Sequence, residues 1–289
     1  MFGNKLLDWL QTHQTPVLDI AMGLVTILGD GWILLTVICL VHWWADRKLG
    51  LRLIIFVLIC GILNLVLKQA FNIPRPAGSL AVKTGPSFPS GHAQMAAAFW
   101  LAIALAYRGR YSILGALVVA VLVAFSRVYF QAHWVADVIA GLLIGWCVAI
   151  AFQGVSNLCL VYPKSRNYLG LVGVATGLAG IWSAYSLSGG TWTHGTRDIL
   201  FYSVGLIVST VAWAYLFNKT SDSLPSLPLG KKILWSVFGL TVVAGMYLRG
   251  MKSFPPISYY IVSVTAVTWI AWVYPVILDR FVLVKNTNI

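Results

Sequence analysis

The sequence predicts an all-α membrane protein, a polytopic helical bundle of about nine transmembrane helices. Of its 289 residues, 59% are hydrophobic and only 10% are charged, and the mean hydropathy is +0.84. A soluble domain needs about 25% charged residues to cover its surface. The apolar residues fall in runs close to the ~20 residues that cross the hydrocarbon core of a bilayer. Composition and run length therefore place most of the chain in lipid.

The predicted elements follow one another with short connections. The first sixteen residues predict a short helix lying at the membrane interface, because their apolar side chains recur at near-helical spacing. The first span is interrupted at Gly29-Asp30-Gly31, so we expect it to bend there. The last span follows Pro255-Pro256, which is typical of a helix start. The predicted spans are residues 18–45, 50–71, 91–107, 112–130, 134–154, 168–188, 199–217, 231–249 and 256–278.

The net charge of +12 does not indicate a nucleic-acid partner. The basic residues lie singly or in pairs between apolar runs, where they orient a membrane protein. Alternate connections carry twelve basic residues on one side and eight on the other, and three of the eight belong to the motif described next. The twelve-residue side should face the cytoplasm, which places segment 72–90 outside. The cysteines are interpreted as apolar fillers without disulfides: Cys39, Cys60, Cys147 and Cys159.

A group of charged and polar residues lies at the predicted span ends on that outer side. Ionisable residues at membrane depth are costly, so their clustering indicates a function. Lys68, Arg75 and Arg127 can surround a phosphate, and the arginines can bind it with two hydrogen bonds each. Ser90 and Gly91 lead into a helix, whose first backbone N–H groups favour an anion.

Two histidines and one aspartate complete this group. His133 and Asp137 are four residues apart and share one helix face. The carboxylate can accept a hydrogen bond from one ring nitrogen and hold the other as a nucleophile. His92 comes from a different helix and can act as a general acid toward a leaving oxygen.

These residues form three motifs: Lys68-x6-Arg75-Pro76, Pro89-Ser90-Gly91-His92 and Ser126-Arg127-x5-His133-x3-Asp137. Together they resemble the signature of the type 2 phosphatidic acid phosphatase superfamily, with all three parts present in order. The resemblance implies a helical catalytic core, no metal, and a phosphohistidine at His133. It also implies the roles given above for His92 and Asp137. We expect a catalytic transmembrane core over 1–188 and a three-helix transmembrane extension over 189–289, which the signature does not explain.

The resemblance implies an integral membrane phosphatase that hydrolyses a lipid phosphate or diphosphate of the phosphatidate, phosphatidylglycerophosphate, polyprenyl diphosphate or lipid A type. No cofactor is expected, and the expected partners are the phosphorylated lipid substrate and membrane lipids. The expected location is a bacterial inner membrane, with the active site facing the periplasm or outside. Three alternatives remain open: a lipid phosphotransferase, a sugar-phosphate phosphatase and a non-enzymatic lipid transporter.

Four residues outside the motifs lie in or beside the outer connections. Lys83, in the outer segment before the second motif, is a candidate for substrate binding. His194 and Arg197, in another outer connection, are further candidates. Trp134, beside the predicted nucleophile, is interpreted as an interface anchor, because tryptophan collects at membrane surfaces.

Overall fold

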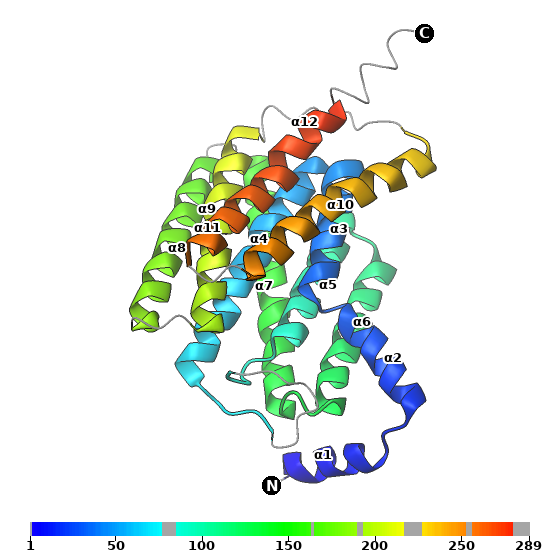
Figure 1. Ribbon diagram of the computed structural model, residues 1–289. Helices are drawn as coiled ribbons and strands as arrows, with labels where there is room; N and C mark the ends of the chain where they lie inside the picture. Colours follow the sequence, from blue (N-terminus) through cyan, green and yellow to red (C-terminus); the bar gives the residue numbers. More distant parts are fainter. Residues whose placement is uncertain are drawn as a thin grey trace. The chain divides into compact units, whose positions relative to one another are not determined.

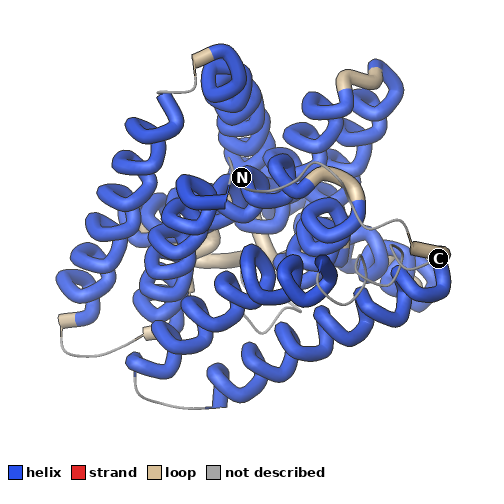
Figure 2. Tube along the Cα trace, turned by 90° about the horizontal axis from the view of Figure 1, so that it is seen from above, coloured by secondary structure: helices blue, strands red, loops and turns tan. Residues whose placement is uncertain are grey.

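The computed structural model describes residues 2–76, 85–162, 165–189, 193–216, 227–252 and 256–279. In these ranges the chain forms helices and connecting loops without a strand (Figure 2), which confirms the predicted all-α class. In chain order (Figure 1) the elements are α1 (Phe2–Thr12), α2 (Pro16–Ile27), α3 (Gly31–Trp44), α4 (Arg47–Phe71), α5 (Gly91–Tyr107), α6 (Arg110–Tyr129), α7 (Val135–Val161), α8 (Ser165–Ser188), α9 (His194–Leu216), α10 (Leu229–Lys252), α11 (Pro256–Thr268), the π-helical turn η1 (Trp269–Val273) and α12 (Tyr274–Leu278).

The helix lengths fit a protein that crosses a membrane many times. Within the described ranges, seven helices are long and apolar enough to span a bilayer. An eighth span arises if α2 and α3 are counted as one, bent by 47° at their junction. This bend lies at the predicted interruption, where the backbone N–H of Trp32 bonds the Asp30 carboxylate at the start of α3. The predicted span 91–107 is α5, which has 17 residues and is shorter than the seven long helices.

The chain divides into two compact units. The first comprises Met1–Leu34 and Cys60–Leu158, and the second comprises Leu35–Ile59 and Cys159–Ile289. All residues of the three motifs fall in the first unit. The division into a catalytic core over 1–188 and an extension over 189–289 remains a prediction.

Close contact between α5 and α7 sets the geometry of the first unit. Gly141 and Gly145 are one turn apart on α7, on the face toward α5. A Cβ atom at Gly141 would lie 2.8 Å from the carbonyl oxygen of Ser90, and one at Gly145 would lie 2.5 Å from that of Gln94. Both distances are shorter than real Cβ contacts, so the two backbones touch. The first turn of α5 is therefore held against the first turns of α7.

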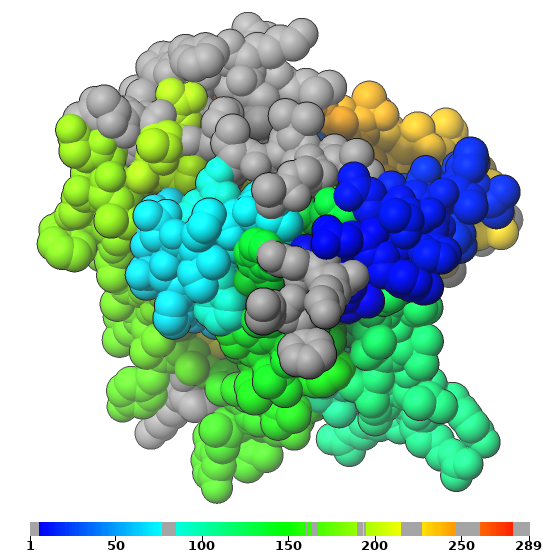
Figure 3. All heavy atoms as spheres, turned by 90° about the horizontal axis from the view of Figure 1, so that it is seen from below, coloured from blue at the N-terminus to red at the C-terminus, as the bar shows by residue number. Residues whose placement is uncertain are grey.

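Two N-terminal helices pack on α6 in the same unit. Helix α2 runs along α6, and the Tyr129 hydroxyl donates to the Asp19 carboxylate at 2.7 Å. Helix α1 buries Leu7 and Leu10 against Val138 and neighbouring apolar residues, while the opposite side of α1 stays exposed. Seen from below, the atoms of α1 lie beside green atoms from the start of α7 (Figure 3). The location of α1 at a membrane interface remains a prediction.

The second unit also relies on small residues at a helix contact. A Cβ atom at Gly173 or Gly177 of α8 would lie within 3 Å of α9 side chains. Elsewhere in this unit, the Arg47 guanidinium at the start of α4 pairs with the Asp279 carboxylate after α12. All four cysteines carry free thiols, three of them buried and Cys147 exposed.

Candidate active site

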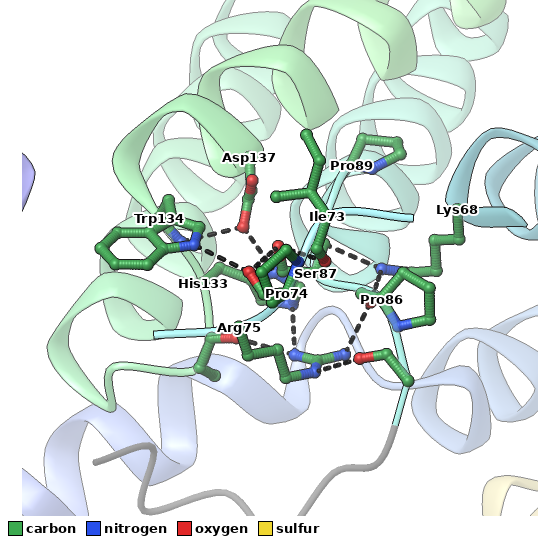
Figure 4. Close-up of polar contacts among 12 residues, drawn as sticks. Lys68, Ile73, Pro74, Arg75, Pro86, Ser87, Pro89, His133, Trp134 and Asp137 are labelled. Atoms are coloured by element: carbon green, nitrogen blue, oxygen red, sulfur yellow. Dashed lines mark hydrogen bonds and ion pairs between the residues drawn. The ribbon is translucent and has the colours of Figure 1, made fainter. Parts of the chain in front are cut away.

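Two of the predicted cations bind the segment that leads into α5. Lys68, in the last turn of α4, donates from Nζ to the carbonyl oxygens of Pro86 (3.0 Å) and Ser87 (2.9 Å). The Arg75 guanidinium donates to the carbonyls of Gly85 (3.1 Å) and Pro86 (3.3 Å). Figure 4 shows both side chains pointing toward these carbonyls. Besides carrying charge, the two residues hold segment 85–87 in place, a role that their sequence positions did not reveal.

The predicted nucleophile lies between a carboxylate and a guanidinium. His133 precedes α7 and is 3% exposed. Its Nδ1 lies 3.3 Å from Oδ2 of Asp137, and its Nε2 lies 3.3 Å from Nη1 of Arg75. The carboxylate only accepts hydrogen bonds, so Nδ1 carries the proton and Nε2 has the lone pair. Both distances are long for hydrogen bonds.

The electrostatic environment keeps His133 neutral. Burial is the main cause that lowers the pKa of His133, to about 4, and the hydrogen bond to Asp137 opposes this shift. The positive charges of Lys68, Arg75 and Arg127 each lower the same pKa further. All three predicted cations therefore act on one imidazole. Burial also lowers the pKa of Arg75, and the charge of Asp137 raises it.

Asp137 has a second contact, at the start of α7. Its Oδ2 accepts from the backbone N–H of Trp134 at 2.9 Å, which satisfies one N–H group that the helix leaves unpaired. The sequence analysis predicted this aspartate as the partner of the histidine, and the helix cap is an additional contact. The structure contains both contacts on one carboxylate oxygen.

The Ser90-Gly91-His92 turn contacts the start of α7 at Asp137. The backbone N–H of Ser90 donates to the carbonyl oxygen of Asp137 at 3.0 Å. Ser90 is the N-cap residue of α5, yet its side chain makes no cap hydrogen bond. Its Oγ is buried and has no partner among the described residues. His92 is partly buried in the first turn of α5.

Arg127 reaches the site from the last turn of α6. The residue is 5% exposed, and its Nη1 donates to the hydroxyl of Thr26 on α2 at 2.8 Å. Its Nε–H is buried and has no acceptor among the residues that the structure describes. Leaving a donor of a charged group buried and unpaired costs about 1–3 kcal/mol or more. Arg127 and Ser90 thus both carry polar atoms suited to an anion.

Several positioning residues were missed by the sequence interpretation. Asn64 lies one turn before Lys68 on α4, and its Nδ2 donates to the side chain of Gln94 at 2.9 Å. The same atom lies 3.4 Å from the Pro89 carbonyl, so α4 and the turn before α5 are linked. A signal was available, because Asn64 and Gln94 are uncharged polar residues inside apolar spans. Ser87 is buried and donates to the carbonyls of Ile73 and Pro74, for which the sequence gave no signal.

The remaining candidates lie elsewhere. Lys83 falls outside the described residues. His194 and Arg197 are in the first turn of α9 in the second unit, and the side chain of His194 is also outside the described part. Among the residues that the structure describes, no group of three or more His, Cys, Asp or Glu side chains could hold a metal ion.

Comparison with known families decides the evolutionary relationship of this site. Residues 49–160 match the PAP2 superfamily, and this range includes every motif residue from Lys68 to Asp137. The chain belongs to the PAP2 superfamily. Several proteins of this superfamily are named as phosphatases of a phosphorylated lipid.

Three relatives in this superfamily can be described. Sphingosine-1-phosphate phosphatase 1 of Rattus norvegicus is 30% identical over 225 residues, which are 71% of this chain and 52% of that protein. An undecaprenyl-diphosphatase of Sulfolobus acidocaldarius is 37% identical over 162 residues, 53% of this chain and 78% of that protein. A third relative has a solved structure, the crystal structure of the first transmembrane PAP2-type phosphatidylglycerolphosphate phosphatase from Bacillus subtilis. The two chains are 30% identical, and the match covers 53% of this chain and 83% of the other, with a TM-score of 0.48. The chain spans about half the length of the sphingosine-1-phosphate phosphatase that it matches.

Proposed function

We propose that this protein is a membrane phosphatase that hydrolyses a lipid phosphate or diphosphate through a phosphohistidine at His133. The observation that carries the proposal is the arrangement around His133. Its Nδ1 is paired with Asp137, and three cations influence its charge. A neutral imidazole with a lone pair on Nε2 is a nucleophile, and the cations supply the environment that a phosphoryl group needs.

The phosphate would be bound by groups from four helix ends. Lys68, Arg75 and Arg127 provide charge, and Ser90 and Gly91 provide a hydroxyl and backbone N–H groups at the start of α5. Two buried atoms support this assignment, Oγ of Ser90 and Nε of Arg127, because neither has a partner within the described ranges. A bound phosphate oxygen would accept from both.

The reaction would proceed in two steps. In the first, Nε2 of His133 attacks phosphorus in line, the bond to the leaving oxygen breaks, and His92 donates a proton to that oxygen. In the second, water attacks the phosphohistidine, His92 takes the proton from the water, and the P–N bond breaks to release phosphate. Asp137 holds the imidazole and balances the positive charge that develops on it.

The substrate would be processed at the surface of a bacterial inner membrane, on the periplasmic or outer side. The family relatives named for lipid phosphates and diphosphates support a lipid substrate. The charge bias supports the side, since twelve basic residues lie in the connections opposite to those of the motif. A phosphohistidine mechanism needs no nucleotide, because the substrate supplies the phosphoryl group.

The test is phosphate release by the purified protein in detergent. The panel contains phosphatidate, sphingosine 1-phosphate, phosphatidylglycerophosphate, polyprenyl diphosphate, lipid A and glucose 6-phosphate, with His133→Ala as the control sample. We expect release from at least one lipid, none from the control, and unchanged rates in EDTA. Lack of turnover on every lipid would contradict the proposal. Product analysis separates hydrolysis from transfer to a lipid acceptor.

A further inference from the structure

The indole of Trp134 joins two segments of the site that are far apart in the sequence. Its Nε1 donates to the carbonyl oxygen of Pro74 at 2.9 Å. The backbone N–H of the same residue donates to the Asp137 carboxylate. Figure 4 shows the indole on the Asp137 side of the site, with its nitrogen directed toward Pro74. This residue therefore contacts both the carboxylate that orients His133 and the segment that carries Arg75.

A second bond runs between the same two segments. Nη1 of Arg75 donates to the carbonyl oxygen of Ala132 at 2.7 Å. Pro74 and Arg75 are consecutive, while Ala132 and Trp134 flank His133. The two bonds thus lie on either side of the nucleophile, and the Arg75 guanidinium stands 3.3 Å from its Nε2. We propose that Trp134 is a positioning residue, whose indole N–H keeps Arg75 against Nε2 of His133. This inference rests on the proposed phosphatase function.

Both backbone and side-chain bonds hold the Arg75 segment, since the backbone N–H of Ser87 also donates to the Ile73 carbonyl at 2.7 Å. Residues 72–76 have no regular secondary structure. Pro74 has no backbone N–H, so its carbonyl oxygen is the only polar backbone group that it offers. Two donors use this oxygen, Nε1 of Trp134 and Oγ of Ser87 at 3.1 Å. Without the indole N–H, Ser87 alone would hold the Pro74 carbonyl, and the position of Arg75 would then rest on that bond and on the guanidinium's own bonds.

The primary test is Trp134→Phe, which keeps an aromatic ring and removes the N–H donor. We expect kcat/KM to fall about tenfold and the inhibition constant of vanadate to rise by a similar factor, as for the loss of one well-placed hydrogen bond. The melting temperature in detergent should stay close to that of the wild type. The matched control is Trp182→Phe on α8, where the ring is 73% exposed, and it should leave all three quantities unchanged.

Two further measurements separate positioning from a general structural effect. Arg75 lowers the pKa of His133, so a displaced guanidinium should move the acid limb of kcat/KM to higher pH in Trp134→Phe. In the background of Arg75→Lys, which loses the planar fork, Trp134→Phe should have little additional effect. Should Trp134→Phe destabilise the protein, Ser87→Ala tests the same carbonyl and should shift the acid limb in the same direction.

Wild-type rates in Trp134→Phe, or effects that add fully to those of Arg75→Lys, would overturn the inference while leaving the phosphatase proposal intact. Absence of phosphate release by the wild-type protein would overturn the proposed function itself. The two failures are therefore distinguishable in one set of assays.

Discussion

At the scale of single residues, the two nitrogens of His133 have different neighbours. Nδ1 lies beside a carboxylate that accepts its proton, and Nε2 lies beside the Arg75 guanidinium. Because the Nδ1 proton is bound by Asp137, the lone pair is directed from Nε2 toward the cations. We therefore expect Nε2 to attack phosphorus, and we expect both Asp137 and Arg75 to influence the rate of phosphate release.

We expect His133→Ala to lower the rate of phosphate release to background, at least roughly 10³-fold, because the attacking atom is removed. Asp137→Asn should retain weak activity, about 10²-fold below the wild type, since an amide oxygen still accepts from Nδ1 but carries no charge. The control is His13→Ala, an exposed histidine at the end of α1. Phosphate release near the wild-type rate from His133→Ala would exclude the mechanism.

The pH dependence should report on the charges around the nucleophile. The pKa of His133 is lowered to about 4, so the imidazole stays neutral well below its usual titration range. Arg75→Gln removes a positive charge that lowers this pKa, so the pKa should rise. The acid limb of kcat/KM, which reports the free enzyme, should then move to higher pH. Comparing variant and wild type on one substrate cancels the titration of the substrate, and a shift to lower pH would contradict this account.

At the scale of helices, the contact between α5 and α7 determines where the two histidines lie. The first turn of α5 brings His92, and the start of α7 follows His133. The glycines of α7 let the backbones touch, and the Ser90 N–H closes the contact on the carbonyl of Asp137. The distance between the proposed phosphate-binding turn and the proposed nucleophile is therefore set by the contact of two helix starts.

A single methyl group at this contact should separate the two helix starts. In Gly141→Ala the new Cβ would lie 2.8 Å from the Ser90 carbonyl oxygen, and overpacking of this kind costs about 1–3 kcal/mol. We expect lower activity and a lower melting temperature. Gly154→Ala on the same helix provides the control, because no atom lies within 4 Å of the added Cβ. This control should be neutral or slightly stabilising, since alanine favours helices more than glycine. Equal behaviour of the two variants would contradict the packing argument.

At the scale of the whole molecule, the sequence predicted the class, the helix order and the bend near Gly29 well, because apolar run length is decisive in a membrane protein. The motif spacing predicted that Lys68, Arg75 and Arg127 surround a phosphate, which stays a prediction, and their influence on the pKa of His133 came from the structure. The bonds from Trp134 and Ser87 to Pro74 could not be predicted. They join segments about 13 and 60 residues apart and depend on the path of a loop, about which residue type says little.

The orientation of the protein in the membrane can be tested by thiol labelling. A variant without the four native cysteines would receive one cysteine, either at Gln11 on α1 or at Arg110 at the start of α6. Both positions are exposed, and α1 packs against the last turn of α6, whereas Arg110 begins that helix at its other end. We expect Gln11→Cys to react with a membrane-impermeant reagent in intact cells, and Arg110→Cys to react only after lysis. The reverse pattern would place the site in the cytoplasm.

The double role of Asp137 has a consequence for how the enzyme matures. One oxygen both closes the first turn of α7 and fixes the proton of His133 on Nδ1. In a nascent chain that has not yet formed this turn, the carboxylate is not held near the imidazole, and the histidine has no preferred reactive nitrogen. We therefore expect the lone pair to be fixed on Nε2 only once the first turn of α7 has formed.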